Sequence, residues 1–407
     1  MRILILAPGT RGDVAPMAGL GKTLGQQGFE VTIAANPDYQ NLVASAGSTF
    51  RELSGDISAL VIPAAPGTKT SATDIRHYLQ ELGSYFNQVA TDSLAAAQHG
   101  TDFILVNSVA PFGFDIAEAL EIPAVGAHLQ PNEPSGNYPP PALGTARNFG
   151  RLSNKALHQL FTRAKAPYDS PTARIRAELG LPKHSRAASE RDRRKAGQPV
   201  LHGFSSTVVP RATDWHEGII NCGYWWPLSD SSWKPSSQLL DFLAAGEPPV
   251  LIGFGSTQAL ELDFLVDVAR RTGRRTIIQG AGDIAESDVL GVGAVPHEWL
   301  FPQVAAVVHH AGAGTSASAL RAGIPAVPVP IFTDQPFWAS RLQHLGASVS
   351  PIPYKNLTVG RLTAGINEVL NNDHFAQSAQ RVSQRLEAEE DGALVAARFL
   401  EQYKPRQ

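Results

Sequence analysis

The chain has 407 residues, of which 43% are hydrophobic and 17% charged, and its formal net charge is -3 at pH 7. This composition excludes a disordered chain, and the length predicts two domains, because one ordinary core does not grow so large. The small acidic excess argues against a nucleic-acid binder, which normally carries a basic surplus.

The sequence also argues against disulfide bonds and membrane spans. Its single cysteine, Cys222, can form neither an internal disulfide nor a cysteine-based zinc site. No apolar run approaches the roughly 18 residues that span a bilayer. The opening MRILILAP is too short and lacks the cleavage pattern of a signal peptide, so we expect a buried strand there. We therefore expect a cytoplasmic protein without stable membrane insertion.

The N-terminal half alternates strands and helices. Residues 3–6 are all apolar, which is typical of a parallel strand buried on both faces. After the loop PGTRGDVAP, apolar residues recur at helical spacing up to Gly28, and a second strand starts at Phe29. The pattern returns as a strand at 103–106, a helix at 112–120 and a strand at 122–127.

Two segments of this half lack regular periodicity. The proline-rich stretch PNEPSGNYPPPAL predicts a long loop, and such loops are usually functional or mobile. The stretch KHSRAASERDRRKAGQP is charged and poor in apolar residues, so we interpret it as an exposed, flexible excursion.

The second half repeats the theme after the linker-like segment YWWPLSDSSWKPSSQ. It predicts strands at 250–252, 276–279 and 304–308, helices at 262–269 and 316–321, and a strand in IPAVPVPI. We divide the chain into a first domain at 1–222, a linker at 223–238, a second domain at 239–385 and a C-terminal helix at 386–407. In open α/β sheets ligands bind beyond the carboxyl ends of the strands, so the cleft between the two halves is the expected site.

The segment HHAGAGT predicts a phosphate-binding loop. It follows a strand and precedes a helix, whose N-terminal N–H groups and dipole favour an anion. Gly312 and Gly314 leave room for the anion, while His310 and Thr315 can donate to it. A tight glycine turn is the alternative interpretation. A metal site of His309 and His310 is disfavoured, since neighbouring strand residues point to opposite faces, so His309 is expected to be structural.

The segment GFGST, residues 253–257, ends a strand in the same way. It predicts a second anion cradle, although a tight turn fits equally well. Gln258 stands where a dinucleotide fingerprint needs glycine, which argues against a dehydrogenase.

At this point the chain resembles a known family, over nearly its whole length. Its opening RILILAPGTRGDVAPMAGLGKTLGQQGFEVTIAA is similar to those of antibiotic-aglycone glycosyltransferases and sterol glucosyltransferases. The stretch VPHEWLFPQVAAVVHHAGAGTSASALRAGIPAVPVPIFTDQPFWASRLQHLGA resembles the sterol branch most, especially in DQPFW, although sterol enzymes usually show GGAGT where this chain has AGAGT.

The resemblance implies the α/β GT-B fold, with two Rossmann-like domains facing across a cleft and a C-terminal helix returning to the first. It implies metal-independent transfer of a hexose from a nucleotide diphosphate sugar, UDP-glucose being favoured, to a hydroxyl of an apolar acceptor such as a sterol or polyketide. No resident cofactor is expected.

The resemblance also implies roles for single residues. Asp13 matches the general base. The residues that match donor contacts are Ser256, His310, Gly312, Gly314 and Thr315 for the phosphates, Val295 and His297 for the nucleotide base, and Asp334 and Gln335 for the sugar. Asp334 also fits a simple turn before Pro336.

The chemistry of Asp13 can be argued from the residue alone. An alcohol that attacks the anomeric carbon must lose its proton, and a buried carboxylate can take that proton in one direct displacement with inversion. The alternative is that Asp13 caps the following helix, since Asp is a favoured N-cap.

The acceptor pocket is expected in the first domain. The candidates lie near strand ends or in the proline-rich loop: Thr10, Asn107, Phe112, His128, Gln130 and Tyr138. Each alone also fits a structural role, and Phe112 fits ordinary core.

Rival interpretations remain. They are a dTDP-deoxysugar transferase, a nucleotide-sugar epimerase or glycan-building transferase, and a nucleotide-sugar sensor without turnover. An epimerase needs an acid and base pair in the second half, where none stands out, and a sensor does not need Asp13. The expected partners are the donor and the acceptor, and the default state is a monomer.

Overall fold

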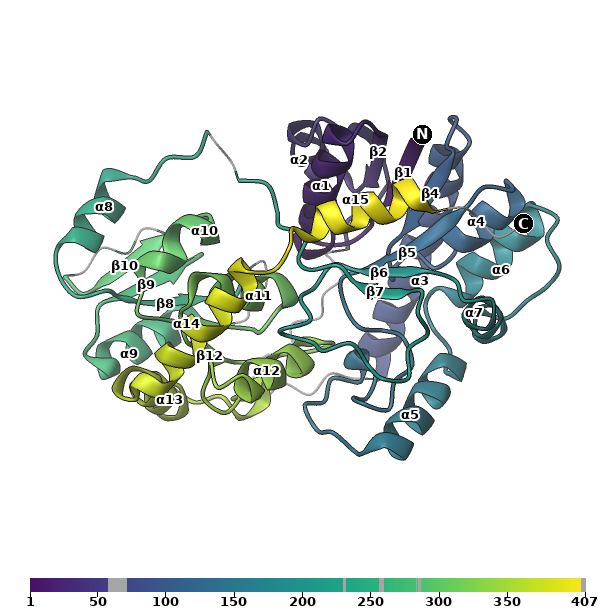
Figure 1. Cartoon of the computed structure of the whole chain (residues 1–407). Coiled ribbons are helices and arrows are strands. Elements are labelled where there is room, and N and C mark those ends of the chain that lie inside the picture. Colours follow the sequence, from purple (N-terminus) through teal and green to yellow (C-terminus); the bar gives the residue numbers. More distant parts are fainter. Residues whose placement is uncertain (58–71, 230–231, 256–259, 283, 285–286, 404–407) are drawn as a thin grey trace.

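The computed structural model describes residues 1–57, 72–229, 232–255, 260–282, 284 and 287–403. This part of the chain forms two α/β domains, each built on a parallel sheet (Figure 1). A helical C-terminal segment runs across both of them (Figure 1). The predicted arrangement of two Rossmann-like domains is therefore confirmed.

The first domain carries a seven-stranded sheet in the order β3-β2-β1-β4-β5-β6-β7. Its strands are β1 (Arg2–Leu6), β2 (Glu30–Ala35), β3 (Thr49–Glu52), β4 (Phe103–Val106), β5 (Ala124–His128), β6 (Val200–His202) and β7 (Ile219–Asn221). Its helices are α1 (Arg11–Gln26), α2 (Gln40–Ser45), α3 (Ala72–Ala97), α4 (Gly113–Ala119), α5 (Arg151–Arg163), α6 (Asp169–Glu178) and α7 (Arg186–Lys195).

Strand β1 shows why this sheet is covered on both faces. Ile3 and Ile5 pack in one core with α1, whereas Leu4 and Leu6 pack in another with α3 and α4. Successive strand residues point to opposite faces, so an all-apolar strand needs a layer of helices on each side.

The second domain carries a five-stranded sheet in the order β10-β9-β8-β11-β12. Its strands are β8 (Val250–Gly253), β9 (Thr276–Gln279), β10 (Val289–Val292), β11 (Ala306–His309) and β12 (Ala326–Pro328). Its helices are α8 (Ser237–Ala244), α9 (Leu262–Thr272), α10 (His297–Leu300), α11 (Ala313–Ala322), α12 (Gln335–His344), α13 (Val359–Asn371) and α14 (Asp373–Glu387).

The last helix, α15 (Gly392–Gln402), returns to the first domain, as predicted, and lies beside α1 (Figure 1). Ala393, Ala396 and Leu400 share a buried core with residues of α1. The indole of Trp225 donates to the carbonyl of Gly392 at 3.2 Å, so the linker and the returning segment meet.

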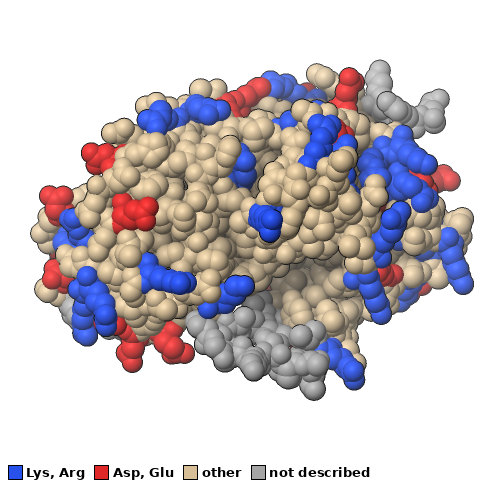
Figure 2. Space-filling view, turned by 90° about the horizontal axis from the view of Figure 1, so that it is seen from below, with Lys and Arg blue, Asp and Glu red and all other residues tan. Residues whose placement is uncertain are grey.

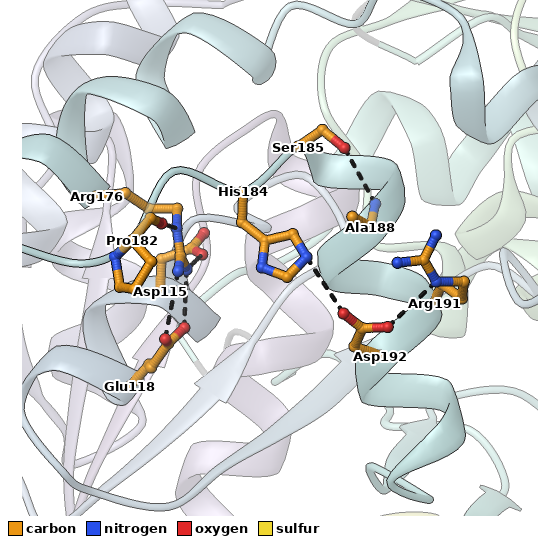
Figure 3. A network of polar contacts seen from close by, with 9 residues as sticks. All are labelled: Asp115, Glu118, Arg176, Pro182, His184, Ser185, Ala188, Arg191 and Asp192. Atoms are coloured by element: carbon orange, nitrogen blue, oxygen red, sulfur yellow. Dashed lines mark hydrogen bonds and ion pairs between the residues drawn. The ribbon is translucent and has the colours of Figure 1, made fainter.

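The stretch KHSRAASERDRRKAGQP is more regular than its composition predicts, because residues 186–195 of it form helix α7. Ser185 caps this helix, and Arg193 lies 4.5 Å from the ring centroid of Phe114. Beside α7, Arg176 bonds Asp115 and Glu118 on α4 (Figure 3). Partners elsewhere in the domain order this charged stretch, and its composition does not reveal them.

The charged side chains are distributed unevenly over the face drawn in Figure 2. Figure 2 shows Lys and Arg spread among Asp and Glu on the side seen from below, with a largely uncharged centre. Among the described residues, no helix is long and apolar enough to cross a bilayer.

Candidate active site

Asp13 lies in the first turn of α1, at the carboxyl end of β1. Thr10 is the N-cap residue, and its backbone N–H donates to Asp13 Oδ2 at 2.9 Å. The Thr10 hydroxyl lies 3.1 Å from the same oxygen. Asp13 therefore does support the helix start, as the N3 member of a capping box rather than as the N-cap itself. Among the described residues no hydrogen bond reaches Oδ1, so one carboxylate oxygen is left for chemistry.

The environment of Asp13 makes its carboxylate a better base. Burial raises the pKa of Asp13 to about 6, hydrogen bonds from Thr10 oppose this change, and the charge of Asp334 adds to it. Asp334 belongs to the second domain, so the carboxyl ends of the two sheets approach each other here. A base with a pKa near the working pH transfers protons most effectively.

Gly9 is required for this position of Asp13. Its φ of +128° is rarely adopted by other residues, and a Cβ built on it would lie 2.4 Å from Asp13 Oδ2. The N–H of Gly9 donates to Oδ1 of the buried Asn36 at 3.0 Å. The Tyr85 hydroxyl donates to the same oxygen, also at 3.0 Å. Asn36 and Tyr85, which the sequence analysis did not single out, thus hold the loop that carries Asp13.

His310 directly follows β11, and its ring lies against Gly255 and Gly312. A Cβ on Gly312 would lie 2.4 Å from His310 Nε2, and one on Gly255 would lie 3.3 Å from its Cε1. Burial, with a contribution from His297, lowers the pKa of His310 to about 4. The ring is therefore neutral near pH 7 and carries one N–H.

Helix α11 begins at Ala313, directly after His310–Gly312. The first N–H groups of a helix have no partner within it, and the exposed Gly314 and half-buried Thr315 lie in that first turn. The predicted phosphate residues are thus together at a helix N-terminus. Ala311 has a φ of +60°, which explains why glycine also suits this position.

The other two histidines of this region differ in their surroundings. His309 is fully buried and its Nδ1 accepts from the N–H of Ala311 at 3.1 Å, which fits the expected structural role. His297 stacks on Phe301 with ring centroids 4.3 Å apart. Burial lowers the pKa of His297 to about 4, and Arg11 of the first domain contributes. Val295 packs its side chain in the core, and its backbone carbonyl accepts from Gln279 Nε2 at 3.4 Å.

Asp334 and Gln335 start α12, and both already have partners. Asp334 accepts from the indole of Trp338 at 2.8 Å and from the hydroxyl of Thr333 at 3.1 Å. Gln335 Oε1 accepts from the N–H groups of Ile331 and Phe332 at 2.8 and 3.2 Å. The Gln335 oxygen therefore holds the loop, and its amide nitrogen is the group left for a sugar.

Of the acceptor candidates, Phe112 and Asn107 are buried in the first domain, whereas Gln130 and Tyr138 lie against the second domain. Phe112 is fully buried in the core, so the structure supports that alternative rather than an acceptor contact. Asn107 is also buried, and its Nδ2 has no partner among the described residues. Gln130 is half-buried and its Oε1 accepts from the Ser108 hydroxyl at 3.4 Å, while its side chain lies close enough to Asp334 of the second domain to lower the pKa of that carboxyl. Tyr138 packs edge-on against Phe337 of α12, with centroids 5.4 Å apart.

His128 has a partner that the sequence analysis missed. Its Nδ1 lies 2.6 Å from Glu133 Oε1, while His202 Nε2 lies 2.5 Å from Glu133 Oε2. No local motif signals this cluster, since it joins the proline-rich loop to a strand about seventy residues away. Ser256, the remaining predicted phosphate contact, lies outside the described residues.

The comparisons with known proteins agree with this arrangement. Residues 3–127 match the Glycosyltransferase family 28 N-terminal domain, and residues 279–401 match the Erythromycin biosynthesis protein CIII-like, C-terminal domain. O-mycaminosyltylonolide 6-deoxyallosyltransferase of Streptomyces fradiae is 32% identical over 96% of this chain and 94% of its own length. The chain belongs to the GT-B glycosyltransferases. The resemblance seen in the sequence is thereby confirmed, and the protein is an enzyme of this family.

Two further comparisons relate the chain to a sterol enzyme and to a solved glycosyltransferase structure. A sterol 3-beta-glucosyltransferase of Arabidopsis thaliana is 30% identical over the whole chain, which spans 66% of that enzyme. Among solved structures, the glycosyltransferase VinC in complex with dTDP superposes with a TM-score of 0.68. VinC is 20% identical, with 98% of this chain and 99% of that one covered, and this likeness supports the fold.

The contact between Gly9 and Asp13 gives a direct test. Gly9→Ala should reduce glycosyl transfer by about 10²-fold, because the added methyl group displaces the carboxylate. Gly25→Ala in α1, the helix that carries Asp13, is the control, since nothing lies within 4 Å of its ideal Cβ. Steady-state kinetics and thermal melting of both variants check this. Equal activity of Gly9→Ala and wild type would show that the position of Asp13 does not limit the reaction.

Proposed function

We propose that this glycosyltransferase moves a hexose from a nucleoside diphosphate, UDP-glucose being favoured, to a hydroxyl of an apolar acceptor, with inversion and without a metal ion. The observation that carries the proposal is the pairing of a raised-pKa carboxylate, Asp13, with a helix N-terminus and a neutral histidine on the facing domain. By their names, the two relatives above act on O-mycaminosyltylonolide and on sterols, which supports an apolar acceptor.

The mechanism follows from the positions of these groups. The acceptor hydroxyl lies between Asp13 Oδ1 and the anomeric carbon and gives its proton to the carboxylate as the new C–O bond forms. On the opposite side the bond from the anomeric carbon to the diphosphate oxygen breaks, and the configuration inverts. Negative charge that develops on the diphosphate is stabilised by the first N–H groups of α11, by Thr315 and by His310.

Donor recognition supports a second candidate. Gln335 Oε1 and the Asp334 carboxylate already accept protein hydrogen bonds, so they have less capacity for sugar hydroxyls than two unpaired side chains. A dTDP-deoxysugar offers fewer hydroxyls and fits such a site. The Streptomyces fradiae relative is named for a deoxysugar, and VinC was solved with dTDP.

The pH dependence of the reaction tests the base. Asp13 must be ionised to accept a proton, so kcat/KM should rise with pH through a midpoint near 6 and then level off. Asp334→Asn removes a charge that raises the pKa of Asp13, so the midpoint should move to lower pH.

Asp13→Asn should lose about 10²- to 10⁴-fold in turnover while nucleotide affinity survives. Full activity of Asp13→Asn would remove Asp13 from the mechanism.

Calorimetric titration with UDP and then dTDP, without added metal, tests the phosphate loop. Wild type should bind one of them, and the preferred base selects between the two donor candidates. His310→Ala should weaken that binding by about tenfold, as expected for one lost hydrogen bond to a charged group. His99→Ala, which removes an exposed histidine of the first domain, is the control. Unchanged affinity of His310→Ala would contradict the phosphate role of this residue.

Metal dependence is tested by dialysis against EDTA. Turnover should persist, because protein N–H groups neutralise the leaving diphosphate in this mechanism. A loss of turnover that Mg²⁺ or Mn²⁺ restores would show that a divalent ion takes part.

A further inference from the structure

The cluster of His128, Glu133 and His202 lies beside the site but has no role in the mechanism above. His128 and His202 are register partners at the carboxyl ends of the adjacent strands β5 and β6. Glu133 comes from the proline-rich loop and places one carboxylate oxygen on each ring. The His202 side chain is fully buried, and those of His128 and Glu133 are each 12% exposed.

Asn221 and Glu133 together fix the ring of His202. Asn221 donates its Nδ2 to the carbonyl of Val209 at 2.9 Å, which fixes the amide so that Oδ1 faces His202 Nδ1 at 3.0 Å. The two ring nitrogens of His202 therefore each face an oxygen, that of Asn221 on one side and that of Glu133 on the other.

A shared metal ion does not fit these distances. Ligands at about 2.0–2.2 Å from a tetrahedral Zn²⁺ lie roughly 3.3 Å from one another. The contacts of 2.5 and 2.6 Å in this cluster are instead those of charge-assisted hydrogen bonds. Although burial opposes ionisation, the two histidines hold the pKa of Glu133 well below its ordinary value.

The loop held by Glu133 is one of the parts of the first domain that meet α12 of the second, together with Phe204 and Val208. Gln130 precedes Glu133 and lies beside Asp334, and Tyr138 follows Glu133 and packs on Phe337. The loop continues to Gly144, whose ideal Cβ lies 3.5 Å from the carbonyl of Thr333. A shift of Glu133 would therefore move contacts to the segment that starts α12.

We propose that Glu133 is a positioning residue for sugar transfer: by bridging His128 and His202 it holds the loop of residues 129–143 where Gln130 meets Asp334. The kinetic part of this proposal rests on the proposed function. The structural part concerns the loop alone and can be tested without turnover.

Two substitutions of Glu133 distinguish the loss of its two hydrogen bonds from the loss of its negative charge alone. Glu133→Ala removes both hydrogen bonds, and kcat should fall at least about tenfold through misplacement of the site. The affinity for UDP or dTDP, whichever the wild type binds, should not change, because the phosphate loop does not touch this cluster. Glu133→Gln should recover part of the loss, since an amide can accept from His128 and donate to a neutral His202.

A double-mutant cycle tests whether Glu133 acts through Gln130. If it does, Glu133→Ala combined with Gln130→Ala should lose no more activity than the worse single variant. Asp115→Asn is the matched control, because it removes a buried carboxylate from an ion pair in the same domain but away from the site (Figure 3). It should lower the melting temperature and leave kcat and KM unchanged.

Hydrogen exchange of the loop amides completes the test. In Glu133→Ala, residues 129–143 should exchange faster than in wild type, whether or not the protein has been shown to transfer sugar. Unchanged exchange there would overturn the anchoring role. Faster exchange with wild-type kcat, or additive losses in the cycle, would overturn the coupling to Asp334. Absence of turnover in wild type with every donor would instead count against the proposed function.

Discussion

The proximity of two carboxylates from different domains is the constraint on which this site depends. Asp13 and Asp334 both have raised pKa values, burial being the largest cause, and the charge of Asp334 adds to the increase at Asp13. Such a pair costs free energy unless neighbouring donors offset it. Thr10 supplies these donors on one side, and Thr333, Trp338 and Gln130 supply them on the other.

This constraint explains features that lie away from the reacting atoms. Gly9 has no side chain, which leaves space for the carboxylate of Asp13 beside the loop. Asn36 accepts a hydrogen bond from the N–H of Gly9. Gly312 likewise leaves space for the ring of His310. In both domains a glycine therefore stands where the side chain of a candidate site residue occupies the space that a Cβ would fill.

The sequence predicted the parts of the site that are local along the chain. Asp13 and the segment from His310 to Thr315 each sit in a strand-loop-helix unit, whose apolar run and glycines are visible in a short window. Distant pairings were not predictable in this way. Glu133 and His202 are 69 positions apart, and helix α7 depends on partners such as Phe114 far earlier in the chain. The sugar contacts of Asp334 and Gln335 stay a prediction, and the sequence did not reveal that the Gln335 oxygen is already used by two backbone N–H groups.

The return of α15 to the first domain has a mechanical consequence. The chain passes between the domains near Trp225 and again before Gly392, and these two crossings touch through a hydrogen bond and through the close approach of Gly392 to the backbone of Gly223. Two covalent links therefore join the domains at one place, and we expect any relative motion of the domains to be a rotation about that place rather than a separation. Such a rotation changes the distance between Asp13 and His310, because the two residues belong to different domains.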